Sequence, residues 1–375
     1  MSAQTDSAAQ DAIDRRFMAA AIRLSRSHDG LTSTNPSVAT LIVRDDGTGP
    51  VIVGRGVTAI GGRPHAETQA LDEAGQLSRD ATAYVTLEPC AHHGRTPPCA
   101  NALVAAGVTR VVGAASDPDP RVSSKGYAIL RAAGIAVVEN VLAQEAADLM
   151  AAYLIRSSKK RAEVTLKLAL SRDGMIGRKG AGQVAITGEI ARRQVQLMRA
   201  RSDAILVGIG TALADDPLLT VRLPGLEARS PTRIVLDRQC RLPLSSKLVT
   251  TAHQVPLFVA ACPEVDPARK AALEKAGVKF LATETFDGRV ALPELLEDLA
   301  GQGISSVMVE GGADTVRAFI EDGLVDRIVL FRGDVEIGAD GIASPLDETN
   351  IPAGFVLKRD EKFGNDRCVE WTRGV

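Results

Sequence analysis

The first apolar positions of the chain recur at helical spacing. Steps of three and four residues place them on one side of a helix, which we expect to begin near Asp14. The preceding residues 1–12 are polar and predict a frayed tail. The apolar residues of the expected helix face are Phe17, Met18, Ala21, Ile22 and Leu24.

Alternating strand and helix patterns follow as far as residue 140. Residues 38–56 hold two β-rich runs around an Asp-Asp-Gly-Thr-Gly turn, which predicts a hairpin. Beyond it, helices that open with proline or end in glycine alternate with short apolar strands, which indicates an α/β layered domain. We expect helices at 64–75, 97–108 and 125–134, and strands at 83–90, 109–118 and 135–140.

A stretch without apolar runs separates two such halves. Residues 157–163 read SSKKRAE, and the alternation resumes directly after them. A chain of 375 residues fits two or three domains of about 150 residues each. We therefore expect one α/β domain at 13–156 and another at 162–375. The predicted strands of the second are 164–171, 203–210, 232–238, 256–261, 278–283, 305–312 and 326–333, and its predicted helices are 188–202, 267–277, 293–303 and 313–323.

Composition narrows the class of protein. Lys plus Arg number 44 against 46 Asp plus Glu, and aromatic residues make up 3% of the chain. Nucleic-acid binders usually need a basic excess and aromatic platforms, so we expect none as partners. No apolar run approaches the roughly 20 residues of a membrane helix, and the polar N-terminus is no signal peptide. Five scattered cysteines suit a reducing cytosol. We expect a cytoplasmic protein that binds small molecules, and a homo-oligomer is left open.

One constellation in the first half has the pattern of a catalytic zinc site. His65 with Cys90 and Cys99 supplies one imidazole and two thiolates, which leaves the fourth position of a tetrahedral zinc open. A water bound there has its pKa lowered to about 7. Glu67 follows His65 by two residues and can move protons without ligating, as in zinc nucleobase deaminases.

Two structural interpretations of these residues are also possible. His92 or His93 could complete a structural zinc site, and isolated cysteines are often small core residues. The intervening stretch AHHGRTPP either contacts a polar substrate or is a plain surface loop.

The second half contains two glycine-bearing strand ends. The segment VMVEGGADTV runs from a strand through glycines into a helix, where backbone amides can hold a phosphate. The segment GIGT is a second such end, although glycines after a strand often form only a turn. Neither matches G-x-G-x-x-G, which disfavours a Rossmann domain. Lys167 and Glu310 stand among apolar strand residues, where a charge is costly unless it is paired or functional.

Several segments resemble the family of bifunctional riboflavin-biosynthesis pyrimidine deaminase/reductases, over nearly the whole chain. In the first half they are TNPSV, HAE, YVTLEPCAHHGRTPPC and SDPDPRVSSKG, and in the second LKLALSRDGMIG, AITG, VGIGTALADDPLLTVR, RIVLDR and VEGGADTVRAFI. The resemblance implies a cytidine-deaminase-like α/β/α domain followed by a dihydrofolate-reductase-like α/β domain. It implies that His65, Cys90 and Cys99 bind Zn²⁺, that Glu67 carries the proton, and that Asn35, Arg95 and His92 bind the deaminase substrate.

The resemblance also implies a reductase site that uses NADPH. Asp215 and Glu310 are its candidate proton donors. Arg233 and Arg238, near Asp237, are either partners of the cofactor's 2′-phosphate or ordinary surface arginines. The implied substrate residues are Lys167, Gln183, Arg199, Leu219, Arg222 and Glu310. The implied cofactor residues are Ala169, Ala185, Thr187, Thr211, Asp215, Gly312, Ala313, Asp314, Thr315, Val316, Arg317 and Ala318.

The implied function is a two-step reaction. The first domain would deaminate 2,5-diamino-6-(5-phosphoribosylamino)pyrimidin-4(3H)-one by hydrolysis. The second would use NADPH to reduce the ribosyl group of 5-amino-6-(5-phosphoribosylamino)uracil to a ribityl chain. An alternative keeps the zinc deaminase but makes the second domain a non-catalytic nucleotide-binding module, because Ala185 stands where the family commonly has tryptophan. An RNA-editing deaminase and a structural zinc protein are two further alternatives.

Overall fold

The structure is a computed structural model that describes residues 2–92, 97–286 and 288–374. The chain divides into two compact units, Met1–Lys160 and Arg161–Val375. In the part of the chain that the structure describes, no helix has the length and apolar character needed to cross a bilayer.

The first unit is a five-stranded sheet with helices on both faces. Its helices are α1 (Ser2–Ser25), α2 (Ala66–Ala74), α3 (Cys99–Ala105), α4 (Lys125–Ala132), α5 (Ala143–Leu149) and α6 (Ala151–Lys159), and its strands are β1 (Ala39–Arg44), β2 (Val51–Val57), β3 (Thr82–Leu87), β4 (Arg110–Ala115) and β5 (Ala136–Val138). The strand order is β2-β1-β3-β4-β5. Strand β1 runs antiparallel to β2 and β3, whereas β3, β4 and β5 are parallel. The predicted hairpin and strand–helix alternation are confirmed.

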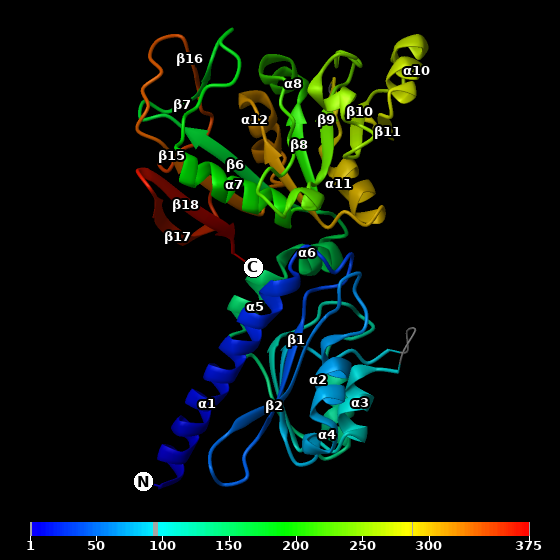
Figure 1. Ribbon diagram of the computed structural model, residues 1–375, viewed down its shortest axis with the longest axis vertical. Helices are drawn as coiled ribbons and strands as arrows, with labels where there is room; N and C mark the ends of the chain where they lie inside the picture. The colour runs from blue at the N-terminus through cyan, green and yellow to red at the C-terminus, as the bar shows by residue number, and fades with distance from the viewer. Residues whose placement is uncertain (1, 93–96, 287, 375) are drawn as a thin grey trace. The chain divides into compact units, whose positions relative to one another are not determined.

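Helices cover both faces of this sheet. Figure 1 shows α1 and α5 on one face and α2, α3 and α4 on the other. Strand β3 is buried along nearly its whole length, as expected of a strand covered on both sides. This arrangement is the expected α/β/α layering.

Helix α1 begins earlier than the apolar pattern predicts. The expectation of a frayed tail at 1–12 is wrong, because the helix starts at Ser2. The segment contains no glycine or proline, and its four alanines favour helix formation. The buried face at Phe17, Met18, Ala21 and Ile22 anchors the C-terminal part of the helix, and the polar turns before it extend from there.

The predicted linker is also shorter than expected. Helix α6 extends to Lys159, and the next strand begins at Glu163. Residues 157–159 contain no apolar side chain because they form the last, polar turn of α6. Only residues 160–162 connect the two units.

The second unit is built on a nine-stranded sheet, with two further two-stranded sheets, β12–β13 and β7–β16. The strands of the unit are β6 (Glu163–Leu170), β7 (Met175–Arg178), β8 (Ala204–Gly208), β9 (Thr232–Leu236), β10 (Leu257–Ala261), β11 (Lys279–Ala282), β12 (Thr285–Phe286), β13 (Arg289–Val290), β14 (Ser306–Glu310), β15 (Arg327–Arg332), β16 (Gly341–Ala343), β17 (Phe355–Phe363) and β18 (Asp366–Arg373). Its helices are α7 (Glu189–Arg201), α8 (Ile209–Asp215), α9 (Lys247–Thr250), α10 (Pro267–Lys275), α11 (Leu292–Gly301) and α12 (Ala313–Glu321). The order β11-β10-β9-β8-β14-β6-β15-β18-β17 is parallel from β11 to β15 and antiparallel beyond.

Alternate residues of the central strands enter different cores. Leu206 packs in the cluster that includes Leu296 of α11 and Phe319 of α12. Its neighbour Ile205 packs in another cluster, with Leu273 of α10. Because successive side chains of a strand point to opposite faces, helices must cover both faces of this sheet.

Two helices and three strand pairs of the second unit were not predicted. They are helix α8, which occupies the end of the expected strand 203–210, the one-turn helix α9, the hairpin β17–β18, the two-stranded ribbon of β7 and β16, and the small hairpin β12–β13. The strands predicted in this half are all present as β6, β8, β9, β10, β11, β14 and β15. The carboxyl ends of the parallel strands meet at one edge of the sheet, which is where α/β proteins bind ligands.

Candidate active sites

Three predicted metal ligands converge in the first unit. The ligand atoms of His65, Cys90 and Cys99 all lie within 4.8 Å of one another. His65 Nδ1 is 3.3 Å from Cys99 Sγ and 3.8 Å from Cys90 Sγ. One imidazole and two thiols at these separations fit zinc and leave one tetrahedral position for water.

Backbone geometry holds these ligands together. His65 is the N-cap residue of α2, and Cys99 is the first residue of α3. The Cys99 backbone N–H donates to Cys90 Sγ at 3.2 Å, so α3 and the loop after β3 are tied at the site. Helix α2 lies close against β2 at Gly56, where a Cβ would stand 2.1 Å from Ala66 O.

The pKa values of the two thiols are shifted in opposite directions. The hydrogen bond from Cys99 lowers the pKa of Cys90 to about 4. The same hydrogen bond, with burial, raises the pKa of Cys99. A cation bound here would take both sulfurs as thiolates and would release the proton of Cys99.

Glu67 lies in the first turn of α2 and does not belong to the ligand group. Its side chain is buried, with only 4% exposure. Burial, reinforced by the neighbouring Cys90 thiolate, raises the pKa of Glu67. A buried carboxyl group beside an open metal position can exchange a proton with a reacting molecule.

The structure describes two of the three predicted substrate residues of this site. The side-chain amide of Asn35 donates to Gly62 O at 2.8 Å, which ties the loop after α1 to the loop before α2. His92 Nδ1 is buried without a hydrogen-bond partner among the described residues. Arg95 lies outside the described residues.

A neighbouring loop was not predicted as part of the site. Glu88, one residue before the Pro89-Cys90 pair, accepts from Ser124 N at 3.1 Å and from Gly126 N at 3.0 Å. Asp117 accepts from Tyr153 Oη at 3.0 Å, and burial raises the pKa of Asp117. The SDPDPRVSSKG motif could have indicated this, because its loop packs against the metal-ligand loop.

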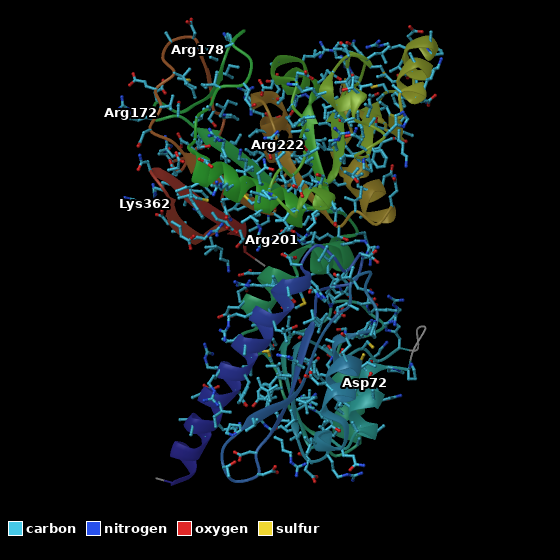
Figure 2. The ribbon with its side chains drawn as sticks, in the orientation of Figure 1. Asp72, Arg172, Arg178, Arg201, Arg222 and Lys362 are labelled. Atoms are coloured by element: carbon cyan, nitrogen blue, oxygen red, sulfur yellow. The ribbon has the colours of Figure 1, made fainter. Side chains whose placement is uncertain are left out.

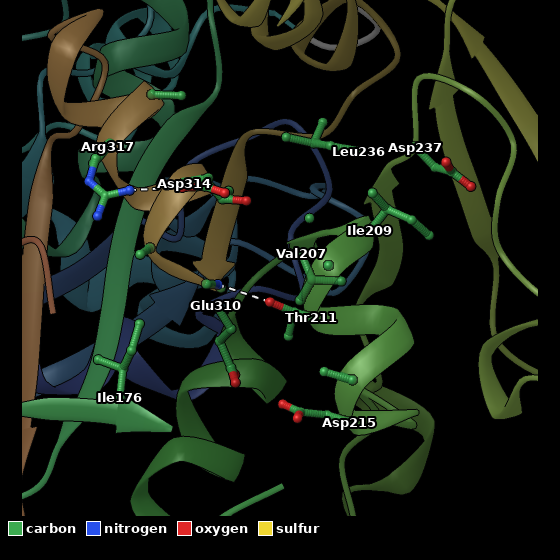
Figure 3. Close-up of a pocket in the computed structure, with 18 of the residues that line it drawn as sticks. Ile176, Val207, Ile209, Thr211, Asp215, Leu236, Asp237, Glu310, Asp314 and Arg317 are labelled. Atoms are coloured by element: carbon green, nitrogen blue, oxygen red, sulfur yellow. Dashed lines mark hydrogen bonds and ion pairs between the residues drawn. The ribbon is translucent and has the colours of Figure 1, made fainter. Parts of the chain in front are cut away.

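The second unit has a cleft of about 1600 Å³ along the carboxyl ends of its parallel strands. A volume above the usual range of about 300–1,000 Å³ can hold two ligands at once. Figure 3 shows part of this cleft, where the carboxylates of Asp215 and Glu310 point toward one another. Its remaining walls come from the β7–β16 ribbon and from residues 284–285 and 288–294.

An ion-pair network forms the floor of the cleft. Glu310 accepts two hydrogen bonds from Arg199, both at 2.9 Å, and its Oε2 lies 4.0 Å from Lys167 Nζ. Burial opposes ionisation of Glu310, yet the charges of Arg199 and Lys167 lower its pKa to about 2. Burial lowers the pKa of Lys167. These two strand charges are thus paired, which offsets part of their burial cost.

Asp215 is the last residue of α8, and its carboxyl group lacks the charged partners that surround Glu310 among the described residues. Burial raises its pKa, so the proton-bearing form persists to a higher pH than in water. Among the two candidate proton donors, Asp215 holds a proton more readily than Glu310.

Close approach of α12 to β8 shapes the middle of the cleft. A Cβ at Gly208 would stand 2.4 Å from Thr315 Oγ1, so a larger residue at 208 would require Thr315 to move. Thr211 Oγ1 accepts from Gly312 N at 2.9 Å, which links the two glycine-bearing strand ends (Figure 3). The Gly312 N–H is thus engaged by Thr211, and both Gly311 and Gly312 line the cleft at the start of α12.

Most predicted reductase residues line this cleft. They are Lys167, Ala169, Gln183, Arg199, Thr211, Asp215, Leu219, Glu310, Gly312, Ala313, Asp314, Thr315, Arg317 and Ala318. Ala185, Thr187, Arg222 and Val316 are not among its lining residues. Arg222 is exposed on the loop after α8 (Figure 2), and Val316 is fully buried in the core.

The two arginines considered for a 2′-phosphate differ sharply. Arg233 is fully buried, where burial lowers its pKa to about 10 and Leu218 O, Thr251 and Val255 O accept its hydrogen bonds. It cannot reach a ligand. Arg238 is exposed and lines the cleft.

Sequence comparisons cover both units. The family described as the RibD C-terminal domain matches residues 162–369, and the cytidine and deoxycytidylate deaminase zinc-binding region matches residues 11–115. The riboflavin biosynthesis protein RibD of Aquifex aeolicus is 39% identical over 363 residues, which cover 96% of this chain and 99% of that protein. Its Escherichia coli counterpart is 39% identical over 374 residues, covering 95% and 98%.

Solved structures agree with these matches. Acinetobacter baumannii RibD, in form 2, superposes with a TM-score of 0.81 at 36% identity, covering 97% of this chain and 99% of that one. The diaminohydroxyphosphoribosylaminopyrimidine deaminase/5-amino-6-(5-phosphoribosylamino)uracil reductase of Thermotoga maritima gives a TM-score of 0.82 at 31% identity, with the same coverage.

Proposed function

The chain belongs to the RibD family of bifunctional deaminase/reductases of riboflavin biosynthesis, and we propose which residues carry out each of its two reactions. We assign deamination to residues 13–156 and reduction to residues 162–375. The substrates would be 2,5-diamino-6-(5-phosphoribosylamino)pyrimidin-4(3H)-one and then 5-amino-6-(5-phosphoribosylamino)uracil, in keeping with the activities named for the Thermotoga maritima relative.

For deamination, His65, Cys90 and Cys99 would hold Zn²⁺, because their donor atoms suit it. Zinc, when bound, supplies Lewis-acid activation of water. Glu67 then accepts a proton from the attacking water and delivers it to the departing amine. Asn35, His92 and Arg95 would hold the substrate, Asn35 from a loop that its own hydrogen bond to Gly62 O fixes in place.

For reduction, the cleft would bind NADPH and the ribosyl substrate side by side. NADPH, when bound, supplies the hydride. Lys167 and Glu310 would orient the sugar, and Arg199 holds Glu310 in its ionised form. Asp215 would deliver a proton to the opened sugar, since its carboxyl faces the same space as Glu310 (Figure 3). The start of α12, at residues 312–315, would hold the cofactor's phosphates.

The wider setting follows from the same chemistry. We propose that the protein works in the cytosol, where a reducing environment keeps Cys90 and Cys99 available as zinc ligands. We propose small phosphoribosyl pyrimidines as its partners and no nucleic acid. A non-catalytic second unit is not favoured, because the Lys167–Glu310–Arg199 network lies at the floor of an open cleft.

The convergence of His65, Cys90 and Cys99 beside the buried Glu67 carries the deaminase proposal. The substitution Glu67→Gln keeps the side-chain volume but removes its capacity to carry a proton. We expect ammonia release to fall by about 10²–10⁴-fold while one zinc per chain is retained. Elemental analysis and an ammonia assay on the same preparation measure both quantities.

A matched control separates this effect from damage to helix α2. Asp72 is exposed on the same helix (Figure 2), and Asp72→Asn removes an equal charge there. It should leave zinc content and ammonia release unchanged. A Glu67→Gln protein that deaminates within about threefold of the wild-type rate would contradict the proposal, since an essential proton carrier contributes far more.

A further inference from the structure

Arg233 of strand β9 is a buried cation that has no acidic partner among the described residues. Its side chain has no exposed area, and burial lowers its pKa to about 10. It donates to Leu218 O at 3.3 Å, Thr251 Oγ1 at 2.7 Å, Thr251 O at 3.1 Å and Val255 O at 2.5 Å, and no described group accepts from its Nε. A charge surrounded by neutral groups is costly to bury, so packing alone does not account for it.

Three of the four bonds have a structural explanation. Those to Thr251 and Val255 join β9 to the end of helix α9 and to the segment before β10. The fourth bond, to Leu218 O, reaches a different segment, the loop of residues 216–222 that follows helix α8. Part of this loop lines the cleft of the second unit. Arg233 therefore connects the core beside β9 to a wall of the cleft.

The loop contains a leucine in a strained backbone conformation. Leu219 has a φ of 56°, in the left-handed region that glycine adopts freely and leucine rarely adopts. Its side chain is buried, with 3% exposure, and it lines the cleft. Strained residues persist only where the surrounding structure holds them, and they often occur at ligand sites. The contacts on either side of Leu219 therefore decide whether this conformation is kept.

Two guanidinium groups hold the backbone on either side of Leu219. Arg233 binds the carbonyl group of Leu218, and Arg199 Nη1 donates to the carbonyl oxygen of Thr220 at 3.3 Å. The carbonyl groups before and after Leu219 are thus fixed in direction. This keeps the peptide groups between them in the left-handed arrangement.

The same loop lies beside the groups that are proposed to react. Arg199 donates to both carboxylate oxygens of Glu310, at 2.9 Å each, so one side chain contacts both the loop and the floor of the cleft. Asp215, the proposed proton donor, is the last residue of α8 and directly precedes the loop. Its carboxylate points toward that of Glu310 (Figure 3). A shift of the loop would change the cleft where the sugar is proposed to bind.

We propose that Arg233 is a positioning residue for reduction, which holds Leu219 in its left-handed conformation and so shapes the cleft wall that meets the ribosyl substrate. This rests on the proposed reduction and adds a residue that acts on it through the loop. Because Arg233 is fully buried, it contacts neither the substrate nor the cofactor. A wall that is fixed in advance lowers the cost of ordering the site when the substrate binds.

The first test is Arg233→Met, which keeps an unbranched side chain and removes the guanidinium. On the zinc-loaded full chain, we expect the KM for 5-amino-6-(5-phosphoribosylamino)uracil to rise by about 10-fold, because the charge-assisted bond that holds the loop is lost. We expect kcat for NADPH oxidation to stay within about threefold, since helix α8 still holds Asp215. Ammonia release by the first unit should be unchanged.

Substitutions of Leu219 separate positioning from a general loss of stability. Leu219→Ala and Leu219→Gly both remove the leucine side chain, but only glycine adopts a positive φ without strain. If Arg233 holds this conformation, Arg233→Met should raise KM by about 10-fold in the Leu219→Ala background and by less than about threefold in the Leu219→Gly background. A structural role elsewhere would give the same ratio in both backgrounds, because independent effects are additive.

A milder variant covers the case in which Arg233→Met does not fold. Thr251→Val removes the hydroxyl that accepts from Arg233 Nη1, the same nitrogen that binds Leu218 O. It should raise KM by about two- to threefold, because the guanidinium remains but is held less firmly. The control is Arg193→Met, at an exposed arginine of α7 outside the cleft, which should leave KM and kcat at their wild-type values.

The outcomes distinguish this proposal from the reaction on which it rests. Equal KM ratios in the Leu219→Ala and Leu219→Gly backgrounds would overturn the positioning role of Arg233. A KM that stays unchanged in folded Arg233→Met or Thr251→Val protein would do the same. Wild-type protein that does not oxidise NADPH with the ribosyl substrate would instead contradict the proposed reduction itself.

Discussion

Asp215 and Glu310 lie in environments that shift their pKa values in opposite directions. Burial raises the pKa of Asp215, whereas Arg199 and Lys167 lower the pKa of Glu310 to about 2 against the effect of burial. The pKa values of two carboxyl groups that face the same space are therefore shifted in opposite directions. Such a pair can divide the work of donating a proton and holding a charged or hydroxyl group.

A proton donor must carry its proton, so the reduction rate should fall as pH rises through the raised pKa of Asp215. Asp215→Asn cannot donate in the same way, and we expect reduction to slow by about 10²-fold and to lose this pH dependence. NADPH oxidation with the deaminated substrate, followed across pH, measures both effects. Ammonia release should be unaffected.

The neighbouring Asp216 provides the control. It adopts a left-handed backbone conformation that asparagine tolerates, and its Oδ1 caps Lys247 N, a bond that an amide oxygen can also accept. Asp216→Asn should reduce substrate at the wild-type rate. An Asp215→Asn enzyme that keeps the wild-type rate and pH profile would remove Asp215 from the mechanism.

At the scale of single residues, the sequence predicts the chemical role of a side chain better than it predicts which residues that side chain contacts. The His65, Cys90 and Cys99 set is found from residue type and spacing, because few alternatives combine these ligands with Glu67. Arg199 illustrates the limit: a guanidinium on a helix could bind phosphate, remain in water or pair internally. The structure shows the pairing with Glu310, a residue 111 positions away in the chain.

Among the elements, helix α1 is held to the sheet by a buried ionic contact in addition to its apolar face. Asp14 accepts from Arg110 of β4 at 2.8 and 2.5 Å and from Tyr84 of β3 at 2.9 Å. Burial favours the neutral carboxyl, but the hydrogen bonds from Arg110, Gln10 and Tyr84 lower the pKa of Asp14 overall. The contact therefore stabilises the folded unit above the unfolded pKa of about 3.9, and that stability is lost as pH falls below it.

Asp14→Asn should reduce the stability of the first unit by about 2 kcal/mol at pH 7, with a smaller difference at pH 3. The chain's three tyrosines, Tyr84, Tyr127 and Tyr153, lie in the first unit and its single tryptophan, Trp371, in the second. In urea unfolding, the tyrosine signal should shift to lower denaturant concentration while the tryptophan signal stays in place.

The same charge removal elsewhere on α1 tests whether the contact matters. Asp11 is exposed, so Asp11→Asn should shift neither signal. If Asp11→Asn and Asp14→Asn shifted the tyrosine transition equally, net charge rather than the Arg110 contact would explain the loss.

Strong periodicity decides which elements can be predicted. Central strands such as β14 and β15 are buried on both faces and read as apolar runs. The edge strand β17 has mainly exposed residues, so its sequence FVLKRDEKF carries no such signal. Helix α8 has seven residues and follows a glycine, which leaves too short a pattern to separate from the end of a strand.

The whole molecule contains two units with separate cores and two sites of different chemistry. The hydrophobic cluster of the first unit shares no residue with the three clusters of the second. The α/β class and the strand–helix alternation of each half follow from the sequence. The walls of the reductase cleft do not, because the β7–β16 ribbon, residues 284–285 and 288–294, and the strand ends that form them lie more than a hundred residues apart in the chain.

The most direct test of the two-reaction account is a coupled assay on zinc-loaded protein supplied with the diaminopyrimidine substrate and NADPH. Ammonia and NADPH absorbance are followed in the same sample. We predict that ammonia appears first and that NADPH then falls by an equal amount. Ammonia release with constant NADPH would contradict the reductase assignment, and NADPH loss without ammonia would contradict the deaminase assignment.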